Sequence, residues 1–158
     1  MDKYEKLLHE AESEGIVVDE NYHFKGRTSG LYIDGNIALS DKLKTVSEKS
    51  CILAEELGHH YTSAGNIIDM ADVSNRKQER RARLWAYNKQ ICLDGLYMAF
   101  VSGCRNRYEI AEFLGVTEEF FDEALAYYAT IYPNGHSNSV LHYTIKFVPN
   151  LQVLMFYD

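Results

Sequence analysis

Residues 53–60 read Leu-Ala-Glu-Glu-Leu-Gly-His-His, the most informative segment of the sequence. On a helix that turns 100° per residue, Glu55 and His59 lie one turn apart, and Glu56 and His60 form the next such pair. The four polar side chains then fit within an arc of roughly 140°. The apolar residues of the segment lie on the opposite side, which predicts a helix with one face towards the core.

Polar side chains spaced in this way have the geometry for binding a metal ion. Positions four apart on a helix have Cβ atoms about 5–6 Å apart, so both side chains can reach one ion. Imidazole and carboxylate both suit zinc, which takes four ligands and keeps one place open in a catalytic site. Zinc-bound water ionises near neutral pH, and a neighbouring Glu can accept its proton. The alternative is an exposed helix on which Glu and His form only weak ion pairs.

A further carboxylate lies on the next predicted helix. Glu79 falls roughly on one stripe with Ala82, Ala86 and Leu93. A carboxylate on such a core-facing stripe is costly to bury unless it is paired or bound to a metal. If the two long helices pack together, Glu79 supplies a third ligand. A solvated Glu79 with Arg83 as its i, i+4 partner is the other interpretation.

The N-terminal region predicts a helix and a small antiparallel sheet. Apolar residues recur at spacings of three and four across residues 2–13, and residues 16–18 read as a strand. Residues 31–39 contain two apolar runs around Asp34-Gly35, a dipeptide that accepts the positive φ angles of a tight hairpin turn.

Helices dominate the rest of the chain. One helix begins after Thr45 or Ser47 and ends near Ser63, and a second runs without a break from about Asn75 to Phe100.

The C-terminal part predicts two short helices and then strands. Residues 107–114 and 117–129 form a helix-turn-helix pattern with Gly115 in the turn. Because its second helix carries no Lys or Arg, we favour a packing role for this pattern over DNA binding. Residues 140–157 predict one or two strands around a turn at Pro149-Asn150.

Composition and charge indicate which classes of function are excluded. The 158 residues favour a single domain, 46% of them are hydrophobic, and the net charge of −7 argues against nucleic acid and anionic membranes as partners. No apolar run approaches the length of a transmembrane helix, and no signal peptide is recognisable, so we expect a cytoplasmic protein. A local basic cluster consists of Arg76, Lys77, Arg80, Arg81 and Arg83. We interpret this cluster as a solvated helix face.

Two segments, residues 53–62 and 78–86, resemble the zinc helix and the following helix of the ImmA/IrrE family of metallopeptidases. Residues 4–8 and 30–33 resemble the short forms found in mobile elements and phages of Gram-positive bacteria. The resemblance extends to about Tyr128. It implies an α+β fold: a zincin-like helical domain over residues 1–158, with the small antiparallel N-terminal sheet and a C-terminal helix-turn-helix-like segment.

The resemblance also implies roles for individual residues. The family's zinc helix normally reads His-Glu-x-x-His, and an acidic ligand follows on the next helix. By this comparison Glu56 is the general base, His59 and Glu79 are metal ligands, and Glu55 is the ligand that replaces the first His. Such a set is richer in oxygen than the usual one. His60 is a possible accessory ligand in a shifted register, in which case Glu56 also binds the metal.

The function implied by the resemblance is a zinc-dependent endopeptidase that cleaves a phage or mobile-element repressor and so relieves repression. The substrate is then a protein with its own helix-turn-helix domain, and no direct contact with nucleic acid or membrane is expected. The alternative is a non-catalytic antirepressor that binds and sequesters the repressor. His142 is a possible accessory residue that stabilises an oxyanion, although a surface histidine is the simpler interpretation.

Overall fold

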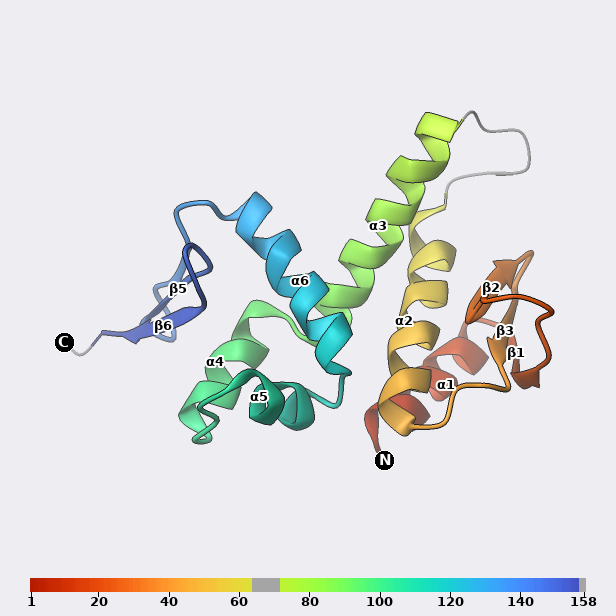
Figure 1. The fold of residues 1–158 in the computed structure, drawn as a ribbon, viewed down its shortest axis with the longest axis horizontal. Helices are drawn as coiled ribbons and strands as arrows, with labels where there is room; N and C mark the ends of the chain where they lie inside the picture. Colours follow the sequence, from red (N-terminus) through yellow and green to blue (C-terminus); the bar gives the residue numbers. More distant parts are fainter. Residues whose placement is uncertain (64–71, 157–158) are drawn as a thin grey trace. The chain divides into compact units, whose positions relative to one another are not determined.

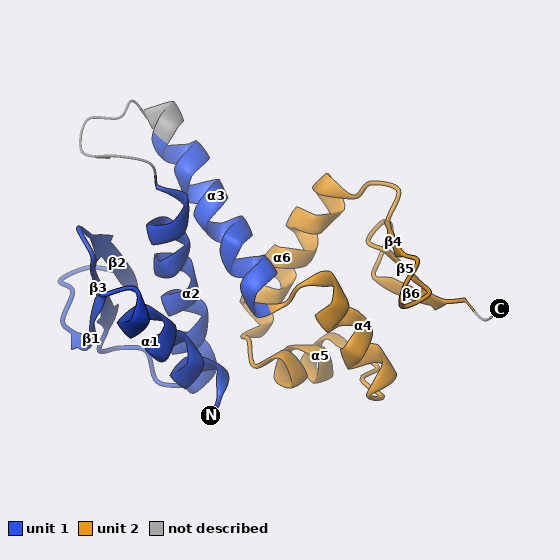
Figure 2. Cartoon of the chain, turned by 180° about the vertical axis from the view of Figure 1, so that it is seen from behind, with its two compact units in different colours: residues 1–90 blue, residues 91–158 orange. Residues whose placement is uncertain are grey.

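The computed structural model of this protein describes residues 1–63 and 72–156. By its internal contacts the chain divides into two compact units, Met1–Gln90 and Ile91–Asp158 (Figure 2). Helices and two three-stranded sheets make the fold mixed α+β, as expected. The single domain over residues 1–158 stays a prediction.

The first unit begins with α1 (Lys3–Ser13) and a sheet made of β1 (Val17–Tyr22), β2 (Gly30–Ile33) and β3 (Asn36–Ser40). The predicted hairpin is confirmed, because β2 and β3 pair in antiparallel register around Asp34 and Gly35, whose φ angles are 46° and 78°. The expectation of a purely antiparallel sheet is wrong, since β1 pairs with β3 in parallel. β3 lies between β1 and β2, and it runs parallel to β1 and antiparallel to β2.

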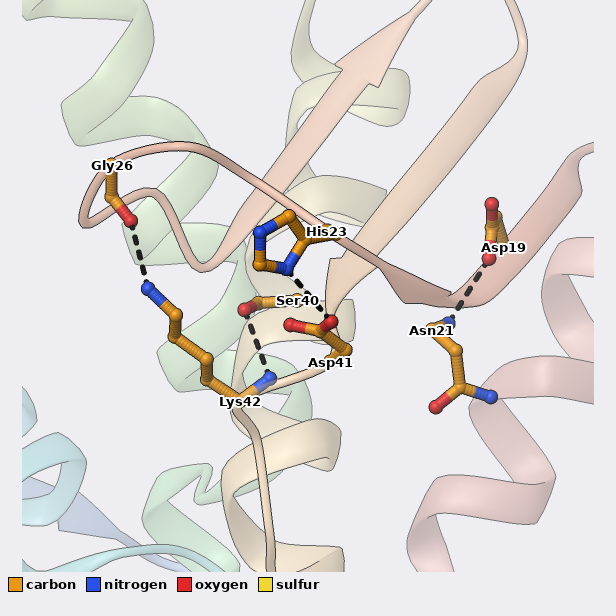
Figure 3. A network of polar contacts seen from close by, with 7 residues as sticks. All are labelled: Asp19, Asn21, His23, Gly26, Ser40, Asp41 and Lys42. Atoms are coloured by element: carbon orange, nitrogen blue, oxygen red, sulfur yellow. Dashed lines mark hydrogen bonds and ion pairs between the residues drawn. The ribbon is translucent and has the colours of Figure 1, made fainter.

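Polar contacts hold the connection between β1 and β2 against the residues that follow β3 (Figure 3). The Nδ1 atom of His23 lies 3.0 Å from a carboxylate oxygen of Asp41. The Nζ atom of Lys42 donates to the carbonyl of Gly26 at 3.4 Å, and the backbone N–H of Asp41 donates to the carbonyl of Tyr22. These contacts fix the ends of β1 and β3 next to each other.

Two long helices, α2 (Val46–Thr62) and α3 (Asp72–Gln90), pack side by side (Figure 1). The Thr45 side chain caps α2 by accepting a hydrogen bond from the backbone N–H of Glu48 at 3.1 Å, which confirms one of the two predicted start points. The helices approach closely at Gly58, where a Cβ atom would collide with the backbone carbonyl of Ala82. Only a residue without a side chain allows this approach.

The predicted continuous helix from Asn75 to Phe100 is wrong, because α3 ends at Gln90 and α4 (Leu93–Val101) begins a new helix. Cys92, between them, has a φ of 47°, outside the helical region. Its Sγ atom accepts a hydrogen bond from the backbone N–H of Gly95 at 3.2 Å and so caps α4. Apolar side chains continue through the break, so the sequence pattern alone conceals it.

The second unit also contains α5 (Arg107–Leu114), α6 (Glu118–Ile131) and an antiparallel sheet of β4 (His136–Asn138), β5 (Tyr143–Lys146) and β6 (Gln152–Met155). Both predicted helices are present, with Gly115 between them at a φ of 69°. The tail strands are confirmed as β5 and β6. Sequence reasoning missed β4 because its three polar residues show no apolar alternation.

No helix within residues 1–63 and 72–156 combines the length and the apolar character needed to cross a membrane.

We predict that Gly58→Ala lowers the free energy of unfolding by about 1–3 kcal/mol, because the added methyl group forces α2 and α3 apart. Helix propensity alone predicts the opposite, since Ala is favoured over Gly in a helix by about 1 kcal/mol. Chemical denaturation followed by circular dichroism measures the change.

Gly95→Ala in α4 is the matched control. Its Cβ atom would meet only side-chain atoms of Leu114 and Cys92, at 3.3 and 3.4 Å, which can adjust. A gain in stability in both variants would contradict the close helix contact at Gly58.

Candidate functional site

The site is built where α2 faces β2. Glu56 on α2 is buried, with 8% of the residue exposed. A Cβ atom at Gly30 would lie 2.9 Å from Oε1 of Glu56, so the missing side chain at Gly30 lets the carboxylate approach the strand. The backbone N–H of Tyr32, two residues along β2, hydrogen-bonds the same carboxylate. The strand therefore holds the Glu56 side chain in place.

Burial changes the acidity of Glu56. Loss of hydration raises the pKa of Glu56 to about 7, and the charges of Glu55 and Glu79 raise it as well. The charge of His59 and the hydrogen bond from Tyr32 lower that pKa without cancelling the effect. A carboxyl group that titrates near neutrality can both accept and return a proton at physiological pH.

A contact between α2 and α3 joins His59 to Glu79. The Nε2 atom of His59 lies 3.2 Å from Oε1 of Glu79, and the two side chains are 18% and 55% exposed. The hydrogen bond between them raises the pKa of His59 and lowers the pKa of Glu79. Arg83 is the alternative partner suggested by the sequence. Its charge also lowers the pKa of Glu79, but it has the smallest effect of the groups that act on this carboxylate.

Glu55 completes the charged cluster. It is partly buried, and its charge raises the pKa of both Glu56 and His59. Three carboxylates, those of Glu55, Glu56 and Glu79, thus raise the pKa of the His59 imidazole. The structure brings Glu55, Glu56, His59 and Glu79 within electrostatic reach of one another, although they come from two helices.

His60 makes contacts of a different kind. Its Nδ1 atom lies 2.9 Å from the hydroxyl of Tyr32, and its Nε2 atom lies 3.2 Å from a carboxylate oxygen of Glu14. His60 therefore links α2 to β2 and to the end of α1. Sequence reasoning missed Tyr32 and Glu14, because they are 28 and 46 residues from His60 along the chain.

His142 belongs to the second unit. Its φ angle is 55°, and its carbonyl accepts a hydrogen bond from the backbone N–H of Phe156 at 2.8 Å. This backbone contact joins the start of β5 to the end of β6. The neighbouring histidine, His136, makes an edge contact with the ring of Tyr132 in the same unit.

The donor atoms allow a test of whether the cluster suits zinc. Two ligands bound to zinc at about 2.0–2.1 Å in a tetrahedron lie roughly 3.3 Å apart. The 3.2 Å between His59 and Glu79 is compatible with two of these positions and equally with the hydrogen bond between the two side chains. Within the described ranges, no group of three or more His, Cys, Asp or Glu side chains is arranged to hold a metal ion.

Comparisons with known proteins identify no relative: no family model, no curated protein and no solved structure matches this chain. The resemblance to the ImmA/IrrE family stays a prediction from the sequence.

The raised pKa of Glu56 predicts a pH-dependent effect of Glu56→Gln in the metal-free protein. Below pH 4.5 the carboxyl group is protonated in both the folded and the unfolded chain, so its burial carries no charge penalty. As the pH rises the unfolded chain ionises first, and above pH 7 the folded chain bears the full cost of a buried carboxylate. We expect Glu56→Gln to stabilise the protein by up to about 3 kcal/mol at pH 8 and to have little effect near pH 4.

Denaturant titrations at a series of pH values, with a chelator present, measure this difference. The exposed Glu123→Gln is the matched control, because its carboxylate stays at the surface on folding. A stabilisation by Glu56→Gln that does not vary with pH would contradict the burial of an ionisable Glu56.

Proposed function

We propose that this protein is a zinc-dependent endopeptidase that acts in the cytoplasm on a phage or mobile-element repressor. The observation that carries this proposal is the buried Glu56, with a pKa of about 7, beside the His59–Glu79 pair. A carboxyl group poised between its two protonation states, next to an imidazole and a second carboxylate, suits hydrolysis of an amide bond.

In the proposed mechanism, His59 and Glu79 would hold a zinc ion, and Glu55 would supply the third ligand. A zinc ion held there would supply Lewis-acid chemistry towards the peptide carbonyl and the attacking water. Glu56 accepts the proton of the attacking water at a carboxylate oxygen and returns it to the nitrogen of the departing amine.

The surroundings of Glu56 support this role. The hydrogen bond from the Tyr32 backbone fixes the orientation of the carboxylate, and the contact with Gly30 keeps water from surrounding it. A base held in one orientation loses little entropy when it reacts. The proposal includes the finer fold assignment, a zincin-like arrangement of α2 and α3 and a helix-turn-helix-like arrangement of α5 and α6.

The second candidate function is a non-catalytic antirepressor that binds the repressor without cutting it. Two observations favour it: Glu55 stands where the usual first His would be, and the described ranges contain no assembled group of three metal donors. In both cases the partner is a repressor with a helix-turn-helix domain. The net charge of −7 complements a basic, DNA-binding partner.

Incubation of the protein with zinc and a purified repressor from the same genetic element tests the proposal. We expect the parent protein to cut the repressor and Glu56→Gln to reduce the cleavage rate by a factor of about 10²–10⁴, because the base is lost while the ligands remain. Glu48→Gln, at the start of α2, should leave the rate unchanged. Gel electrophoresis and mass spectrometry of the fragments provide the measurement.

Undiminished cleavage by Glu56→Gln would show that the assignment of the base is wrong. Recovery of intact repressor in a stoichiometric complex with the parent protein would instead identify the antirepressor.

A further inference from the structure

The side of the N-terminal sheet that faces away from α2 is apolar and exposed. Along β2, Gly30 approaches Glu56 and Tyr32 contacts His60 on the α2 side, so the alternate residues Leu31 and Ile33 project to the other side. Leu31 and Ile33 are 43% and 53% exposed. One face of β2 thus contacts the candidate site, and the other face exposes large hydrophobic side chains.

Strand pairing explains why this outer face is hollowed. The register aligns Leu31 with Ala38 and Asp19 in one row across the sheet. The short Ala38 side chain lies on the central strand, between larger side chains on β2 and β1. The result is a groove along β3, with a hollow of about 280 Å³.

The second row has the polar Asn36 on the central strand. Ile33 aligns with Asn36 and Val17, and Val17 is 66% exposed. A shift in register between Asp19 and Tyr22 interrupts the alternation of β1, and Tyr22 also lines the hollow. Single exposed hydrophobic residues are common on protein surfaces, whereas Val17, Leu31 and Ile33 gather around one hollow.

The dimensions of the groove match those of a single α-helix. Strands lie about 4.8 Å apart, so the two outer strands of this sheet are separated by roughly 10 Å, close to the diameter of one α-helix. The five residues of β3 extend about 17 Å, which corresponds to roughly eleven helical residues. The face therefore covers roughly 200 Å², whereas a standard interface buries about 800 Å² on each partner. It accommodates one helix and is too small to hold a dimer together.

The charge around the groove indicates which kind of helix it binds. Among the described side chains that line the hollow, Asp19 carries a charge and none is Lys or Arg. One of its carboxylate oxygens accepts a hydrogen bond from the backbone N–H of Asn21 at 3.0 Å, which restrains the group at the edge of the groove (Figure 3). The net charge of −7 repels a second copy of the chain and attracts a basic partner.

We propose that the groove along β3 on the outer face of this sheet binds an amphipathic helix of a partner protein. Aliphatic side chains of that helix, spaced at i, i+3, i+4 and i+7, fill the space between Val17 and Leu31–Ile33. A Lys or Arg at the edge of its apolar stripe pairs with Asp19. The groove and the Glu56 cluster lie on opposite sides of β2, so this docking does not depend on the proposed peptidase activity.

The probe is a fluorescein-labelled 14-residue helical peptide with Leu at positions 3, 6, 7 and 10 and Lys at the two positions that flank this stripe. A twin peptide carries Glu in place of each Lys. In fluorescence anisotropy at low salt, we expect the parent protein to bind the Lys peptide about three- to fivefold more tightly than the twin. The double substitution Leu31→Ser with Ile33→Ser should weaken binding about tenfold or more, and Asp19→Asn should remove the preference for Lys.

Leu154→Ser on β6 is the matched control, since Leu154 is 44% exposed, as Leu31 is, but belongs to the second unit. Circular dichroism confirms that each variant is folded. Failure of the parent to bind the Lys peptide, equal affinity for both peptides, or unchanged binding by the double variant would each overturn the proposal. A dimer in sedimentation equilibrium that is lost in the double variant would assign the face to a second copy and overturn it as well.

Discussion

The contact between Gly58 and Ala82 sets the distance between α2 and α3, and the candidate site depends on that distance. His59 on α2 and Glu79 on α3 reach each other at 3.2 Å across these two closely packed helices. With a side chain at position 58, the helices would separate and Glu79 would move away from His59. A packing constraint on a residue without a functional group therefore controls the geometry of the charged residues.

A second close approach works in the same way on the other side of α2. The missing side chain at Gly30 lets the Glu56 carboxylate lie against β2, where the Tyr32 backbone hydrogen-bonds it. Burial there raises the pKa of Glu56 to about 7. Ionisation of this buried carboxyl group therefore lowers the free energy of unfolding at and above neutral pH. Such a cost is common at functional sites, because a base must titrate near the pH at which it works.

Sequence patterns predicted the features that depend on local chemistry. The hairpin at Asp34-Gly35 and the start of α2 after Thr45 follow from turn and capping preferences, and both are present. The parallel pairing of β1 with β3 depends on which strand lies in the centre, which no local pattern reveals. The break at Cys92 was missed because a non-Gly residue with a positive φ angle leaves no compositional signal. For the site, helical spacing grouped Glu55, Glu56 and His59, whereas the separate role of His60 depends on the distant residues Tyr32 and Glu14.

The metal content of the purified protein tests whether His59 and Glu79 form the proposed zinc site next to Glu56. Elemental mass spectrometry after zinc reconstitution compares the parent with His59→Ala, Glu79→Ala and His60→Ala. The account predicts about one zinc ion per chain, lost in His59→Ala and Glu79→Ala and kept in His60→Ala, because His60 makes its contacts with Tyr32 and Glu14. No zinc in the parent, or loss of zinc in His60→Ala alone, would contradict the account.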